Sequence, residues 1–230
     1  LNCLKTLGIK IKNKKKYCEI HGKGINSFNY KNNLVLNAGN SGTLGRLILG
    51  LLVHSPKKIK LIGDRSLSKR DFSRVTEPLK KIGGKFYFNK KNKLPLSILG
   101  TKFAKPINYN ENKGSAQCKS CVMLAALNTE GETIIKAKRS RNHTELLFKY
   151  LKIPIKVRKK TKFDLIKIKG KKEFKSFNYK VPADISSSAF FIALTALSEN
   201  SRLIIKSVNI NPTRGGVIEI LSKMGVKISL

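Results

Sequence analysis

The chain has few of the residues from which acid–base and metal sites are built. Of its 230 residues only 13 are Asp or Glu and three are His, against 48 Lys and Arg. The sequence shows no Ser-His-Asp or His-Cys arrangement, and three histidines cannot make a convincing metal site. A functional site in this chain is therefore expected to hold anions without a metal.

Cysteines and long apolar runs are also scarce. Cys118 and Cys121 have the C-x-x-C spacing, but Cys3 and Cys18 lie far away in the sequence. Apolar residues around Cys118 and Cys121 predict a helix, so we expect buried structural thiols. No segment approaches the roughly 18 apolar residues of a membrane span. Because a signal-peptide pattern is also missing, we expect a cytoplasmic protein with no membrane partner.

The formal charge of +35 is large enough to suggest a nucleic-acid partner. Nine of the 48 basic residues are Arg, and the rest are Lys scattered along the chain. Lysine is the generic surface cation, whereas arginine provides bidentate recognition of phosphate and bases. We therefore expect no nucleic-acid partner. A basic nucleic-acid-binding module remains an alternative, and its binding would weaken steeply with salt.

One segment recurs in which a helix ends in Leu-x-x-(Leu/Ile/Met)-Gly and an alternating strand follows. It occurs at Leu4–Ile11, Leu79–Phe86 and Leu221–Ile228, with a degenerate copy at Phe148–Ile155. The glycine predicts a left-handed helix C-cap, and the alternation predicts a strand with one buried face.

The repeat extends upstream to serine-containing loops that open helices. These loops stand at 40–43, 114–117 and 184–188, and short aliphatic strands are expected after the helices, at 59–62, 133–136 and 203–206. A period of about 70 residues predicts an α/β fold built from copies of a strand-helix-strand-helix-strand unit, whose equivalent loops face one cleft. Because the chain begins at Leu1 and 226–230 reads as an interrupted strand, we expect an internal fragment of a longer protein.

Three clusters rich in hydroxyls, amides and cations carry the candidate chemistry: 40–46, 63–74, and 114–120 together with 140–145. In the first, a Gly-Asn-Ser-Gly loop precedes an aliphatic helix. Glycine allows close backbone approach, and a helix N-terminus offers free N–H groups to an anion. An ordinary helix cap is the alternative for this loop taken alone.

At these residues the chain resembles the EPSP synthase family, 3-phosphoshikimate 1-carboxyvinyltransferases. The strings occur in family order over nearly the whole chain. They are Asn37–Thr43 with Arg46, Gly63-Asp64, Ser66-Leu67, Lys69-Arg70, Arg74-Val75, Pro78-Leu79, Gly114–Gln117, Lys119-Ser120, Ser140-Arg141, His143–Glu145, Val181-Pro182, Asp184–Ser187, Asn211–Arg214 and Met224-Gly225.

The resemblance implies an inside-out α/β barrel of repeated βαβαββ units in two domains. Residues 1–180 would form most of the N-proximal domain and 181–230 the incomplete first part of the second. It also implies a transferase of the shikimate pathway to chorismate and aromatic amino acids. Such an enzyme moves the enolpyruvyl group of phosphoenolpyruvate to the 5-hydroxyl of shikimate 3-phosphate and needs no cofactor. We expect a monomer when full length.

The resemblance also assigns the binding residues. Phosphoenolpyruvate would contact Gly42, Arg70 and Gln117, with Asn40 and Arg46 supporting the loop. Shikimate 3-phosphate would contact Ser115, Ala116, Gln117, Ser140 and Arg141. The family's proton-transfer residues have no counterpart in this sequence, so the catalytic residues are unassigned and we expect the chain alone to be inactive.

The sequence departs from the family pattern at a few positions in these clusters. Asp71-Phe72 stand where Pro-Met is usual, and Gly45 stands where an apolar residue is usual. Asp71 places a carboxylate beside Arg70, where it would weaken an anion clamp. Within the fold, the UDP-N-acetylglucosamine enolpyruvyl transferases are the alternative, although the Gly-Ser-Ala-Gln and His-Thr-Glu strings count against them.

Overall fold

The computed structural model describes residues 1–25 and 27–230. The chain divides into two compact units, Leu1–Ser176 and Phe177–Leu230. This division lies four residues before the domain boundary expected at 180. In the described residues, no helix combines the length and apolarity needed to cross a bilayer.

The first unit opens with helix α1 (Asn2–Thr6) and a hairpin of β1 (Lys10–Asn13) and β2 (Cys18–His21). A four-stranded sheet with three helical segments follows. Its elements are β3 (Leu34–Asn37), α2 (Gly42–Leu52), β4 (Ile59–Ile62), η1 (Leu67–Lys69), α3 (Ser73–Ile82), β5 (Lys85–Phe88) and β6 (Leu96–Leu99).

The rest of this unit has the same topology. Its elements are β7 (Asn108–Glu111), α4 (Ala116–Ala126), β8 (Glu132–Lys138), α5 (His143–Tyr150), β9 (Ile155–Lys159) and β10 (Phe163–Lys169). The two sheets have strand orders β3-β4-β6-β5 and β7-β8-β10-β9. In each, the first two strands are parallel and the remaining pairs antiparallel. The predicted βαβαββ repeat is therefore confirmed.

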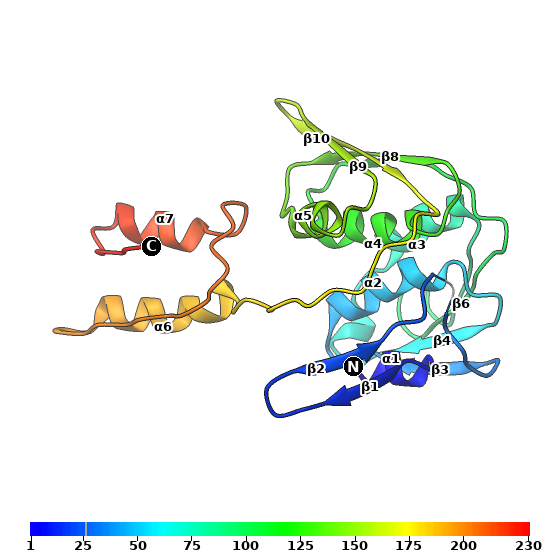
Figure 1. Ribbon diagram of the computed structural model, residues 1–230, viewed down its shortest axis with the longest axis horizontal. Coiled ribbons are helices and arrows are strands. Elements are labelled where there is room, and N and C mark those ends of the chain that lie inside the picture. The colour runs from blue at the N-terminus through cyan, green and yellow to red at the C-terminus, as the bar shows by residue number, and fades with distance from the viewer. Residues whose placement is uncertain (26) are drawn as a thin grey trace. The chain divides into compact units, whose positions relative to one another are not determined.

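Helices α2 to α5 of the first unit lie between its two four-stranded sheets (Figure 1). Each strand turns alternate side chains toward the helices, as in β8, where Thr133, Ile135 and Ala137 are buried. Helices α2 and α4 pack side by side at the centre. His54, just after α2, donates from Nε2 to the Ala125 carbonyl of α4 at 2.8 Å. The apolar core is thus on the helix side of both sheets.

Short polar side chains begin the helices that follow the serine loops. Ser41 Oγ accepts from Leu44 N–H at 3.1 Å, and Ser115 Oγ accepts from Cys118 N–H at 3.3 Å. At the third loop the cap is Asp184, whose Oδ1 accepts from Ser186 N–H at 3.2 Å. These bonds satisfy N–H groups that a helix leaves unpaired in its first turn.

The repeated glycines end helices in the left-handed conformation, as predicted. Their φ angles are 86° at Gly8, 124° at Gly83 and 93° at Gly225. In the degenerate copy Lys152 takes this position, with a φ of 56°. A side chain with a Cβ is strained there, because the left-handed region crowds Cβ against the backbone.

Replacing Lys152 by glycine is therefore expected to raise the free energy of unfolding by about 1 kcal/mol. Lys149→Gly, in the exposed face of the same helix, is the matched control and should lower it by about 1 kcal/mol. Chemical denaturation monitored by circular dichroism measures both. Destabilisation by Lys152→Gly would contradict the argument.

The second unit contains α6 (Ile185–Leu197), α7 (Gly216–Lys223) and a parallel bridge between Ala183 and Val208. Two sequence predictions are wrong here, because 203–206 and 226–230 are not strands. Both segments alternate as strands do, but within Phe177–Leu230 neither has a neighbouring strand to pair with. An extended segment becomes a strand only when a neighbour accepts its backbone hydrogen bonds.

Candidate active site

The first element of the site is the loop that leads into α2. Gly39 has a φ of 54°, and its N–H donates to Asn37 Oδ1 at 2.8 Å. Gly42, the first helical residue, donates its N–H to the Asn40 carbonyl at 3.1 Å. The backbone of Asn40 thus supports the turn, and the positive end of the α2 dipole points out of it.

Two arginines converge on this helix end. A Cβ placed on Gly42 would lie 2.9 Å from Arg70 Nη1 and 3.0 Å from Arg46 Nη1. Arg70 follows η1, and Asp64 orients that loop by accepting from Leu67 N–H at 2.7 Å. Asp64 also donates its own N–H to the Gly39 carbonyl at 2.9 Å, which joins the two loops. Helix end and guanidinium groups together form a positive surface.

Gln117 connects this surface to α4. Its Oε1 accepts from Arg46 Nη1 at 2.7 Å, and its Nε2 donates to Thr43 Oγ1 at 2.7 Å. The oxygen and the nitrogen of the side-chain amide are therefore both hydrogen-bonded, and the bond to Oε1 orients Arg46. The structure brings together the predicted residues Asn40, Gly42, Arg46, Arg70 and Gln117.

Two departures from the family pattern, Gly45 and Phe72, compensate each other next to Arg46. Phe72 is fully buried, and the Arg46 guanidinium lies 5.5 Å from its ring centroid. A Cβ on Gly45 would lie 3.4 Å from Phe72 Cζ. The absence of a side chain at residue 45 therefore leaves room for the ring, which makes a cation–π contact with the Arg46 guanidinium.

The Asp71 carboxylate is directed toward α3. Its Oδ1 accepts from Ser73 N–H at 2.6 Å, in the first turn of that helix. Partial burial raises the pKa of this carboxyl, but the bond from Ser73 and the charges of Arg74 and Arg46 lower it more, so the net shift is downward. The Asp71 carboxylate thus satisfies an N–H group in the first turn of α3.

Ser115, Ala116, Ser140 and Arg141 follow the ends of two adjacent parallel strands, β7 and β8. The loops are close, since a Cβ on Gly114 would lie 3.5 Å from the Arg139 carbonyl oxygen. Ser115 Oγ caps α4, as described above, and Ala116 is the first helical residue. Ser140 Oγ is buried and has no hydrogen-bond partner in the described part of the chain.

Sequence reasoning missed a polar contact near these loops, the buried ion pair between Lys119 and Glu145. Both residues stand in strings that identified the family, but no local pattern pairs them. The expected structural thiols are confirmed, because Cys118 and Cys121 are free and buried in α4. Burial raises the pKa of the Cys118 thiol, which keeps it protonated at neutral pH.

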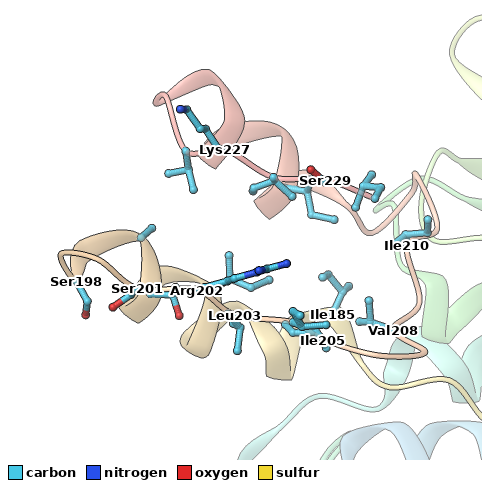
Figure 2. Close-up of a pocket in the computed structure, with 18 of the residues that line it drawn as sticks. Ile185, Ser198, Ser201, Arg202, Leu203, Ile205, Val208, Ile210, Lys227 and Ser229 are labelled. Atoms are coloured by element: carbon cyan, nitrogen blue, oxygen red, sulfur yellow. The ribbon is translucent and has the colours of Figure 1, made fainter.

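The second unit contains a groove of about 1200 Å³ between α6 and the segments that follow α6 and α7. Figure 2 shows Ile185, Leu203, Ile205, Val208 and Ile210 among the residues that line it. Its lining is largely aliphatic, with Arg202 and Lys227 as its cations. This chemistry does not suit two polyanionic ligands, so the candidate site is the cationic one in the first unit.

A family model described as EPSP synthase (3-phosphoshikimate 1-carboxyvinyltransferase) matches residues 1–230. The 3-phosphoshikimate 1-carboxyvinyltransferase of Streptococcus mutans is 40% identical over 232 residues, covering 100% of this chain and 53% of that protein. Its namesake from Bacillus subtilis is 38% identical with the same coverage. A solved EPSP synthase structure from Acinetobacter baumannii superposes with a TM-score of 0.83 at 36% identity, covering 97% of this chain and 50% of that one. The chain spans about half the length of the curated relatives it matches.

Proposed function

The chain belongs to the EPSP synthase family, and from this premise we propose that its first unit binds phosphoenolpyruvate and shikimate 3-phosphate for enolpyruvyl transfer. The observation that carries the proposal is the convergence of Arg46, Arg70 and Gln117 on the N-terminus of α2. Membership of this family supports shikimate 3-phosphate over the UDP-N-acetylglucosamine alternative. The EPSP synthase-like fold predicted from sequence is likewise confirmed.

Phosphoenolpyruvate would lie against Gly42, where the helix dipole and two guanidinium groups attract its phosphate and carboxylate. Arg70 is exposed and unconstrained by an ion pair in the described residues, so it has donors available for a ligand. Arg46 is oriented by Gln117 and supported by Phe72. Asn40 would act through its backbone, by holding the turn.

Shikimate 3-phosphate would lie beside phosphoenolpyruvate, and Gln117 would contact both. Ser115 and Ser140 would donate hydrogen bonds from their hydroxyl groups to its phosphate. Ala116 would contribute its backbone, and Arg141 would add a positive charge. The two substrates would then be adjacent on one positive surface, which raises the effective concentration of one for the other.

In the reaction, the 5-hydroxyl oxygen bonds to C2 of phosphoenolpyruvate and the C–O bond to phosphate breaks. The methylene carbon accepts a proton and later loses it, while the hydroxyl proton leaves to a base. We propose that 1–180 and 181–230 are most of the N-proximal domain and the start of the second. The proton-transfer groups would lie in the part of the relatives that this chain does not match. We also propose that the full-length enzyme is monomeric and cytoplasmic.

Isothermal titration calorimetry of the 230-residue chain tests the proposal. We expect shikimate 3-phosphate to bind and shikimate to bind at least about tenfold more weakly, because the phosphate contacts are lost. Mixing both substrates with the chain should release no phosphate. Equal affinity for shikimate and its phosphate would refute the assignment. Salt-dependent binding to duplex DNA without binding of shikimate 3-phosphate would favour the nucleic-acid module instead.

A further inference from the structure

A buried ion pair joins α4 to α5 directly behind the proposed substrate loops. Lys119 Nζ lies 2.5 Å from Glu145 Oε1, and the two side chains are 0% and 5% exposed. Lys119 stands two residues after Gln117, and Glu145 stands four residues after Arg141. The pair therefore connects α4, which follows the loop of Ser115, to α5, which follows the loop of Ser140 and Arg141.

A second contact acts at the same place. Ser120 and Thr144 share a hydrogen bond between their hydroxyl groups at 2.7 Å. Two consecutive residues of α4 thus contact two consecutive residues of α5: Lys119 pairs with Glu145, and Ser120 pairs with Thr144. These two contacts fix the first turn of α5 against α4, and the loop 140–142 enters that turn directly.

The ion pair is a poor source of stability. Taking both charges out of water is costly, and the cost is repaid only when the remaining polar atoms are also paired. Apart from the ion pair, Lys119 Nζ and Glu145 Oε2 have no hydrogen-bond partner in the described part of the chain. Apolar side chains of similar size would fill this position at no loss of stability. Fixed geometry is what the charged pair adds.

We propose that Lys119 and Glu145 are positioning residues, which hold Ser140 and Arg141 in register with Ser115 for binding of shikimate 3-phosphate. The inference rests on the proposed function for the identity of the ligand. We expect the pair to affect shikimate 3-phosphate more than phosphoenolpyruvate, because Gly42, Arg46 and Arg70 lie on neither α4 nor α5. Gln117 shares α4 with Lys119, but its own bonds to Arg46 and Thr43 hold it.

The test replaces the pair by apolar residues of similar size, K119M/E145M, in the 230-residue chain. We expect the melting temperature to stay close to that of the parent. Calorimetry should show shikimate 3-phosphate binding weakened by about tenfold or more, since contacts to a charged group are misplaced. Affinity for phosphoenolpyruvate should change by less than about twofold. The matched control is K167M/E132M, which removes an exposed Lys–Glu pair in the same unit and should change neither affinity.

A second variant and a second measurement keep the inference testable if K119M/E145M unfolds. S120A/T144V leaves the ion pair in place and should weaken shikimate 3-phosphate binding in the same direction. Hydrogen exchange of the ligand-free chain should show faster exchange at 140–142 in each folded variant, with other loops unchanged. Unaltered exchange and affinity in the folded variants would overturn the inference. A parent chain that fails to bind shikimate 3-phosphate would overturn the proposed function instead, and the exchange data would still decide whether the pair orders the loop.

Discussion

Replacing Gly50 by alanine is expected to lower the free energy of unfolding of the first unit by about 3 kcal/mol. Gly50 is buried in α2 where this helix packs on α4, and a Cβ at this position would lie 2.2 Å from the carbonyl oxygen of Cys121. That oxygen belongs to the backbone of another helix, so no side-chain rotation relieves the overlap. The two helices must separate, and this loosens the core cluster that contains Leu49, Leu52 and Cys121.

Gly45→Ala is the matched control, because it is the same substitution in the same buried helix. There the new Cβ would lie 3.4 Å from the Phe72 ring, an ordinary contact. The gain in helix propensity, about 1 kcal/mol, offsets any adjustment of the ring. Urea denaturation of both variants measures the difference. Equal stabilities for the two would show that the α2–α4 crossing tolerates a wider spacing than the structure has.

The repeat could be read from the sequence because its signals are local. Gly8, Gly83 and Gly225 each end a helix where only a residue tolerant of positive φ fits. Ser41 and Ser115 each precede a helix whose first N–H groups need acceptors. Strand pairing is not local, and this is why 203–206 and 226–230 were wrongly predicted as strands. Their alternation is real, but a strand also needs a neighbour.

The candidate site could be predicted in part. Family strings named Gly42, Arg70 and Gln117, but the bonds of Gln117 to Arg46 and Thr43 join residues about 70 positions apart. The period of about 70 residues predicts that these loops meet, but it does not say which side chains bond to each other. The same holds for Phe72, which looked like a departure of unknown effect. Its relation to Gly45 and Arg46 appears only when the loop after η1 is packed on α2.

Replacing Gly42 by alanine is expected to weaken phosphoenolpyruvate binding by about 10- to 100-fold, the cost of losing one to two contacts to a charged group. The added methyl would stand 2.9 Å from Arg70 Nη1 and 3.0 Å from Arg46 Nη1, in the space where the anion would meet both groups. Stability should change little, because the atoms it meets are the ends of flexible side chains. Shikimate 3-phosphate affinity should also persist, since Ser115, Ser140 and Arg141 are untouched.

Calorimetric titration of phosphoenolpyruvate, in the presence of shikimate 3-phosphate, measures this effect. Gly22→Ala provides the control, because a Cβ there meets nothing within 4 Å and its φ is not positive. A Gly42→Ala chain that binds phosphoenolpyruvate as the parent does would remove the α2 N-terminus from the site. Loss of both affinities together with a lower melting temperature would instead mean that Gly42 supports the fold. Only a selective loss places the anion between the helix end and the two arginines, because the N-terminus of α2 is where the described residues bring the positive end of a helix dipole and two guanidinium groups together.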